Sequence, residues 1–244
     1  MKSGVDLKAP LNPEAHLELE WLETNGLGGY ASSTPLTCHT RKYHGLFVSS
    51  VPHHEGRYLL LSELAAALVF DDEIVELSTN RYNDVLHPGG YTHIDSFSFR
   101  PSPTMTWKVG RAKITRQILM PRGERAVYVK FGLKGRQNVH LRLRPLMSFR
   151  DSHGLTHENE HLRPRSYRVG RGFSFSPYPD MPTLEFQSNE PLSFLPGPFW
   201  EKDVKYEWEA RRGFDCQEDR FCPGTLEFGG KFRNVSEPGT SRTG

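Results

Sequence analysis

The sequence predicts a mainly β protein, a large antiparallel β-supersandwich with one short helix near its C-terminal end. Apolar and polar residues alternate with a period of two in short runs along most of the chain, which is typical of half-buried strands. Turn-forming residues separate these runs at roughly every eight to twelve residues, a spacing typical of sandwiches. A chain of 244 residues is also long enough to bury a substantial core.

Apolar residues alternate with glutamates from Leu17 to Trp21, which predicts a first strand in this part of the chain. We expect this strand to end at Asn25. It leads into three glycines, which tolerate positive φ or a close approach to the backbone: Gly26, Gly28 and Gly29. The glycines partly match a dinucleotide-binding motif, G-x-G-x-x-A. A helix should then follow, but the cap and breaker residues of 32–35 follow instead. A tight corner between two strands is the better interpretation.

The period of two continues through the middle of the chain. The predicted strands are 46–51, 57–62, 66–70, 73–77, 95–101, 104–110, 112–120, 125–133, 139–149, 166–170 and 172–177. Hairpin turns are expected at Asp71-Asp72, at Gly110-Arg111, across Lys134 to Gln137, and at Gly170 to Gly172. Residues 83–91 are expected to form a loop.

A helix is predicted over Glu201 to Arg212, where Val204 and Trp208 share one face and Gly213 is a plausible stop. Trp208 is expected to be a core residue of this helix. Trp200 is the better candidate for an exposed ring that could stack on a sugar. We expect residues 1–228 to form one β-sandwich domain and the polar residues 229–244 to form a disordered tail.

Composition favours some partners over others. The net charge is +2 and no basic stripe is present, so we expect no nucleic-acid partner and no membrane anchor. The three cysteines, Cys38, Cys216 and Cys222, show no disulfide framework or zinc-knuckle spacing, and no apolar leader follows Met1. A cytoplasmic location is therefore expected.

Residues His157 to His161 spell H-E-x-x-H. On a helix, the two histidines would share a face and could bind zinc, with Glu158 activating water. Gly154 and Pro164 flank the segment, however, and argue against a helix. Paired carboxylates that could cleave a glycosidic bond are available in 157–161 and around Glu218, but their separation cannot be read from sequence.

Three stretches carry a family resemblance: "EWLETNGLGGYASSTPLTCHTRKYHGLFV", "LRPLMSFRDSHGLTHEN" and "YEWEARRGFDCQEDRFCPGTLEF". They resemble the amino-terminal domain of prokaryotic-type glycogen debranching enzymes, whose first motif contains a TNGxGGYA turn and an RxYHG segment. The likeness covers nearly the whole chain in the family's order. In that family the intact protein hydrolyses α-1,6-linked glucosyl branches, and its catalytic acids lie in a carboxy-terminal (α/α)₆ barrel that has no counterpart here.

The resemblance implies a non-catalytic domain that packs on the barrel, helps to shape the glucan site, and needs no cofactor or metal. Its implied partners are an α-glucan and the barrel domain. The positions implied to face substrate or barrel, with Trp200 added for its ring, are Asn25, Gly26, Gly28, Gly29, Tyr30, Arg41, Tyr43, His44, Arg150, Asp151, His157, Glu158, Asn159 and Trp200. A free-standing α-glucan-binding module and a zinc hydrolase using 157–161 remain as alternatives.

Overall fold

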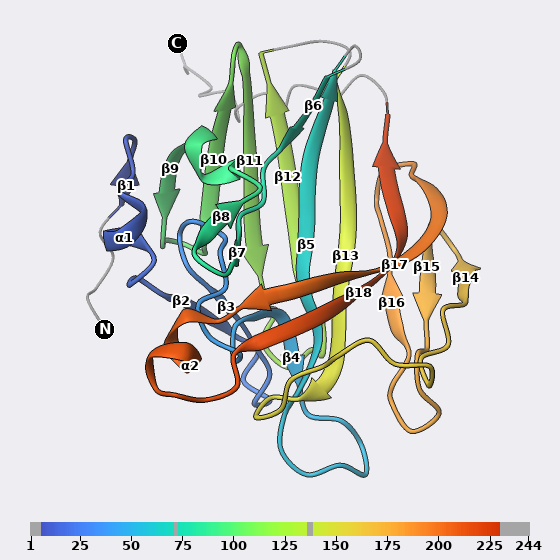
Figure 1. Ribbon diagram of the computed structural model, residues 1–244. Helices are drawn as coiled ribbons and strands as arrows, with labels where there is room; N and C mark the ends of the chain where they lie inside the picture. The colour runs from blue at the N-terminus through green and yellow to red at the C-terminus, as the bar shows by residue number, and fades with distance from the viewer. Residues whose placement is uncertain (1–5, 71–72, 136–138, 230–244) are drawn as a thin grey trace, which may run out of the picture.

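A computed structural model describes residues 6–70, 73–135 and 139–229. The fold is mainly β, every strand pair is antiparallel, and the helices of the described residues are short, which confirms the predicted class (Figure 1). The expected turn at Asp71-Asp72 and the tail beyond Gly229 lie outside the described residues.

The largest sheet has eight strands. They are β2 (Trp21–Thr24), β3 (Tyr30–Ser33), β4 (Gly45–Ser49), β5 (Tyr58–Phe70), β6 (Glu73–Glu76), β13 (His140–Asp151), β17 (Ser193–Lys205) and β18 (Gln217–Phe228). Their order is β17-β18-β13-β5-β4-β3-β2, and β6 also pairs with β5. β5 is buried along almost its whole length, including Ser62 and Glu63, because both of its faces are covered.

The second sheet has five strands in the order β1-β9-β10-β11-β12. They are β1 (Leu7–Lys8), β9 (Ile94–Ser98), β10 (Thr104–Val109), β11 (Ala112–Leu119) and β12 (Tyr128–Lys134). The two large sheets share one core, in which Trp107 and Ile114 of this sheet belong to the same cluster as Leu60 and Leu141 of the eight-stranded sheet.

Smaller elements complete the described chain. A three-stranded sheet contains β14 (Ser166–Val169), β15 (Gly172–Phe175) and β16 (Leu184–Phe186), and a two-stranded sheet contains β7 (Asn80–Tyr82) and β8 (Val85–His87). The helices are α1 (Pro13–His16), a 3₁₀ turn η1 (Gly90–His93) and α2 (Glu207–Arg211). Figure 1 shows the three-stranded sheet on the opposite side of the molecule from β1 and β9.

Two of the predicted hairpins are present, and one is wrong. β10 and β11 meet at Gly110-Arg111, and β14 and β15 meet at Gly170 to Gly172. β12 and β13, however, belong to different sheets and do not form a hairpin. A period of two identifies a strand, but it does not say which sheet the strand joins.

The predicted helix over Glu201 to Arg212 is mostly wrong. Val204 and Lys205 belong to β17, where they pair with Glu218 and Gln217, and α2 begins only at Glu207. Sheet pairing with β18 here overrides the local helical pattern. The first strand is likewise shorter than predicted, because β2 begins only at Trp21 and residues 17–20 are not part of a strand.

Candidate functional site

Most of the predicted site residues lie at one end of the sandwich, where β13 ends and α2 lies, at the lower edge of Figure 1. Four connections meet there: the turn between β2 and β3, the loop 34–44, the loop after β13, and the segment around α2. Contacts among these connections and the adjoining ends of β13 and β18 hold the site together.

The β2–β3 turn is built around the buried side chain of Asn25. Its Oδ1 accepts hydrogen bonds from the N–H groups of Leu27 (2.9 Å) and Gly29 (3.0 Å), and its Nδ2 donates to the carbonyl of Glu124 (2.9 Å). Gly26 has φ +74°, and a Cβ at Gly29 would lie 2.7 Å from Asn25 Nδ2. The predicted tight corner is therefore confirmed, and its glycines meet a backbone requirement.

The loop before β4 places two donors on one carboxylate. Arg41 Nε donates to Glu20 Oε1 at 2.5 Å, and His44 Nε2 lies 3.4 Å from the same oxygen. His44 Nδ1 accepts from the N–H of Thr40 at 3.2 Å, so the proton of a neutral ring resides on Nε2. The bonds from His44 and Arg41 outweigh partial burial and lower the pKa of Glu20 to about 2.

Trp208 is not the core residue that the sequence predicted. The guanidinium groups of Arg41 and Arg211 lie over its ring, 4.7 and 4.9 Å from the centroid, and the side chain is only partly buried. The buried residue of α2 is Glu209, which accepts a 2.6 Å hydrogen bond from Arg212. The ring of Trp208 is thus engaged by cations rather than open to a sugar.

Beneath the loops lies a buried ionic cluster formed by Arg150, Glu218 and Tyr206. Arg150 donates to both carboxylate oxygens of Glu218, and the Tyr206 hydroxyl donates to Oε2 of the same group. Arg150 also donates to the carbonyl of Lys42 at 2.8 Å, and the N–H of Thr156 donates to Glu218 at 3.1 Å. The cluster therefore joins β13, β18 and three connections at one point.

Electrostatics agree with this pairing. Burial alone would lower the pKa of Arg150, but the adjacent Glu218 carboxylate outweighs burial and the net shift is upward. Burial, reinforced by the Glu218 charge, raises the pKa of Tyr206. The arginine therefore stays charged and the phenol stays neutral.

Arg150 and Asp151 are adjacent in the sequence but do not form an ion pair with each other. Arg150 donates to the backbone carbonyl of Asp151 at 3.0 Å, while the Asp151 carboxylate accepts from the N–H of His153 at 2.7 Å. An irregularity in β13 turns Arg150 toward Glu218, and Phe149 just before it has φ +48°, an uncommon value for a bulky residue.

Three side chains stand above the cluster and are partly or fully exposed: Lys42, Tyr43 and His153. Lys42 Nζ donates to the carbonyl of His153 at 2.6 Å, and the Tyr43 hydroxyl lies 3.2 Å from His153 Nδ1. The Tyr30 hydroxyl donates to the carbonyl of Tyr43 at 2.9 Å and holds the loop from below. We call Lys42, Tyr43 and His153 the polar triplet.

The segment 157–161 is irregular, so the helical geometry required for a pair of zinc-binding histidines is not formed. Glu158 is bound instead to Lys202 (2.5 Å), and Asn159 donates to the Tyr178 hydroxyl (3.1 Å). Among residues 6–70, 73–135 and 139–229, no three or more His, Cys, Asp or Glu side chains are grouped so as to hold a metal ion.

Trp200 lies apart from the polar triplet. It belongs to β17, and its half-buried ring packs edge-on against Phe221, with the centroids 5.3 Å apart. The expected exposed platform for a sugar is therefore not present. An exposed ring on the same strand is Phe199, which is 40% exposed.

Sequence reasoning missed the buried role of β18. Glu218, Asp219 and Arg220 are all buried, although charged residues of this kind are mostly exposed. Asp219 accepts from Lys202 and from the N–H of Glu158, both at 2.9 Å, and Arg220 binds Glu63 and Glu201. The spacing of two between Glu218 and Arg220, just before the apolar Phe221 and Cys222, is the one local signal that could have indicated buried charges here.

The geometry defines a class of protein: a β-sandwich domain whose loops at one end are fixed by buried ion pairs. Residues 19–233 match the family described as glycogen debranching enzyme N terminal. The chain therefore belongs to the glycogen debranching enzyme N-terminal family, as the resemblance implied. No curated protein and no solved structure gave a match. No helix in the described part of the chain is long and apolar enough to cross a bilayer.

Proposed function

We propose that this chain is the non-catalytic amino-terminal domain of a glycogen debranching enzyme. It packs on an (α/α)₆ barrel that cleaves α-1,6-linked glucosyl branches, and the polar triplet helps to orient the glucan. The observation that carries this proposal is the end of the sandwich where the four connections meet, which we call the loop-built end. There, buried Arg150 and Glu218 fix an exposed set of hydrogen-bonding side chains above them. The proposal includes one domain over 1–228, a role in glycogen catabolism and a cytoplasmic location.

The state of the buried acids supports a non-catalytic role. Glycoside hydrolysis needs two carboxyl groups about 5–10 Å apart on either side of a sugar. Glu218 is held by Arg150, Tyr206 and Thr156, and no sugar can reach it without displacing them. Glu63 borders a cavity of only about 20 Å³, which has room for about one water molecule.

The chemistry of the polar triplet supports contact with a hydroxyl-rich ligand or a polar partner surface. An ammonium, a phenol and an imidazole together offer donors and acceptors, and the mutual bonds of Tyr43 and His153 limit the entropy lost on binding. The same observation favours a second candidate function, a free-standing α-glucan-binding module. Dependence on the barrel distinguishes the two.

The test uses the purified chain and a separately expressed barrel domain of a glycogen debranching enzyme. We expect the chain alone to release no glucose from branched limit dextrin and to show no calorimetric binding to glycogen. Addition of the chain should increase hydrolysis by the barrel. Glycogen binding by the chain alone would favour the module, and glucose release by the chain alone would refute the proposal.

Variants then locate the contact. Tyr43→Phe and His153→Ala should weaken the stimulation of the barrel by about tenfold each, because a lost hydrogen bond to a polar ligand costs about 1 kcal/mol or more. Tyr167→Phe is the matched control, since Tyr167 is exposed on β14 of the three-stranded sheet, which contains no residue of the polar triplet. An equal effect of Tyr43→Phe and Tyr167→Phe would contradict the assignment.

A further inference from the structure

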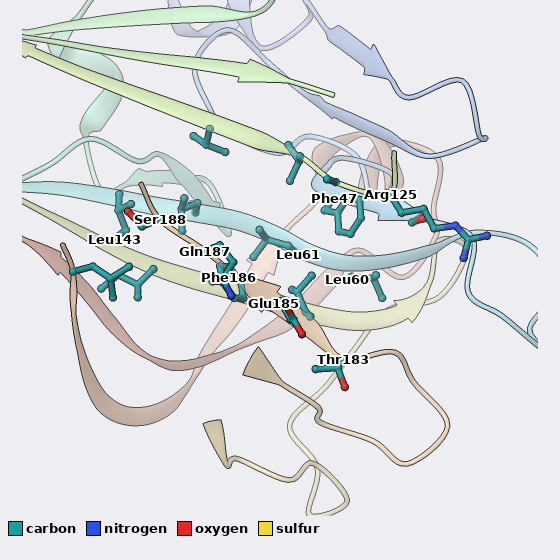
Figure 2. A pocket seen from close by; sticks show the side chains of 18 of the residues that line it. Phe47, Leu60, Leu61, Arg125, Leu143, Thr183, Glu185, Phe186, Gln187 and Ser188 are labelled. Atoms are coloured by element: carbon teal, nitrogen blue, oxygen red, sulfur yellow. The ribbon is translucent and has the colours of Figure 1, made fainter. Parts of the chain in front are cut away.

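A second feature of the molecule, separate from the loop-built end, is an apolar cavity of about 560 Å³ (Figure 2). It lies between the inner face of the eight-stranded sheet, β12 of the five-stranded sheet and the segment around β16. None of the predicted site residues lines it. Its volume is in the range of sites that bind ligands.

The floor of the cavity is apolar and elongated. Leucines of three adjacent strands form it: Leu60, Leu61 and Leu64 on β5, Leu141 and Leu143 on β13, and Leu226 on β18. Leu141 pairs with Leu68 of β5 and with Phe228 of β18. The floor thus extends along β5 from Leu60 to the level of Leu68, roughly 26 Å at ~3.3 Å per residue.

One side of the cavity is bordered by the edge of a strand. Every residue from Pro182 to Glu190, a range that includes β16, borders the cavity. Successive side chains of a strand point to opposite faces, so an unbroken run of bordering residues indicates that the backbone edge faces the cavity. β16 pairs with β15 on its other edge, and no strand of the described chain pairs with this one. Figure 2 shows Glu185, Phe186 and Gln187 at this border.

The opposite side is formed by β12, the last strand of its sheet within the described residues. Val127, Val129 and Phe131 border the cavity at every second position, and they are only half-buried. The inward residues of the neighbouring strand β11, Ile114 and Ile118, are 2% and 1% exposed. The inward side chains of β12 are therefore less completely buried than those of β11, and the space between the two sheets is open at this edge.

We propose that this cavity accepts an extended peptide strand from another polypeptide. The strand pairs with the free edge of β16 and places alternate apolar side chains on the leucine floor, which is strand addition to an exposed edge. The length of the floor fits a segment of about eight residues with an apolar residue at every second position. This proposal does not depend on the proposed role in glycogen debranching.

The lining favours a peptide over a sugar or an anionic amphiphile. The leucine floor offers few hydrogen bonds to sugar hydroxyls. Arg125 at the mouth has no ion-pair partner among the described residues, but the carboxylates of Glu185 and Glu190 border the same cavity. An anionic head group would be attracted by Arg125 but repelled by Glu185 and Glu190. A peptide backbone is neutral, and its N–H and C=O groups can form hydrogen bonds with the unpaired edge of β16.

The test uses a fluorescein-labelled synthetic peptide of alternating Val and Thr with a Lys at each end, and its binding is measured by fluorescence anisotropy. We expect saturable one-to-one binding and slower hydrogen exchange of amides in 182–190. A peptide of the same composition in block order should bind at least about tenfold more weakly. A peptide N-methylated at alternate residues should lose affinity similarly, because it cannot pair with the edge.

Two variants of β12 place the contact. Val129→Lys puts a charge toward the cavity and should abolish binding, whereas Lys130→Glu changes the neighbouring exposed residue and should leave binding intact. Thermal melting checks that each variant folds. If Val129→Lys does not fold, Val129→Leu replaces it, because this change adds one methylene group without charge. Val129→Leu should weaken peptide binding by narrowing the cavity.

Other occupants would overturn the proposal. Binding of sodium laurate, sensitive to Val129→Lys and without peptide binding, would assign the cavity to an amphiphile. A concentration-dependent dimer with protected amides in 182–190 and no peptide binding would assign it to a second copy of this chain. Failure of every probe to bind would leave the cavity without the proposed role.

Discussion

Two regions of the molecule differ in how their polar and apolar groups are satisfied. At the loop-built end, Arg150 donates four hydrogen bonds to Glu218 and to two backbone carbonyls, and Glu218 accepts from three residues. At the cavity between β12 and β16, apolar side chains are half-buried and a strand edge is unpaired within the described residues. In the first region the buried charges of Arg150 and Glu218 are paired, whereas in the second region apolar side chains and a strand edge remain open to solvent.

This difference has energetic consequences. A buried charge without its partner is very costly, so the first region tolerates little change. Half-buried apolar residues have less to lose, because truncation opens no new void beside an existing cavity. The same contrast separates the proposed roles: a fixed platform for hydroxyl or partner contacts, and an acceptor that gains apolar burial when it is filled.

The largest expected effect is that of Arg150→Met. It leaves Glu218 buried without its cation, and we expect a loss of about 3–5 kcal/mol in the free energy of unfolding, measured by urea denaturation. The matched control is Arg142→Met at the half-exposed pair with Glu227, where about 0–1 kcal/mol is expected. Similar losses in the two variants would show that the buried Arg150–Glu218 pair contributes no more to stability than the half-exposed Arg142–Glu227 pair.

A double variant tests the same pair from the other direction. Arg150→Met combined with Glu218→Leu removes both charges, so we expect a loss smaller than the sum of the two single losses. Some loss should remain, because Tyr206 and the N–H of Thr156 still lose their acceptor. Strict additivity would contradict direct coupling.

The next effect compares packing in the two regions. Leu59→Ala, at a residue that is 1% exposed in β5, should cost about 2–5 kcal/mol. Val129→Ala on β12 should cost about 1 kcal/mol or less, because its side chain already borders the cavity. Denaturant midpoints of both variants provide the measurement. An equally large loss at Val129 would mean that the β12 side is fully packed.

The sequence predicted the fold class because a period of two is a local property of each strand. Asn25 and its glycines were also predictable, since a Gly-rich corner after a strand has a local cause. The assignment of β12 and β13 to different sheets was not predictable, because sheet membership depends on contacts far apart in the chain. The helix at Glu201 failed for the same reason: pairing of Val204 with Glu218 is a tertiary effect.

The site was predictable as a list of residues but not as a set of contacts. The resemblance named Arg41, His44 and Arg150, yet their partners are remote: Glu218 is 68 residues from Arg150. His153, 110 residues from Tyr43, was not singled out as a site residue. Adjacency in the sequence does not identify the partner either, since Arg150 pairs with Glu218 and not with Asp151, the acid next to it.

The smallest expected effect concerns acid. Glu20 has a pKa lowered from 4.5 to about 2 in the folded chain by His44 and Arg41. Its ionised form therefore stabilises the fold above about pH 4.5, and this contribution disappears as the pH falls from about 4.5 to about 2. Glu20 is 35% exposed, so solvent screening limits the effect to at most about 1 kcal/mol.

Glu20→Gln should therefore flatten the decline of unfolding free energy between pH 4.5 and pH 2 relative to the unmodified chain. Glu185→Gln, at an exposed carboxylate on β16, is the control and should leave the slope unchanged. Arg41 and His44 are the basic residues that face Glu20, and the Glu20 carboxylate is the group whose lowered pKa spans this pH window. A slope unaffected by Glu20→Gln would mean that Arg41 is anchored by Trp208 rather than by the carboxylate.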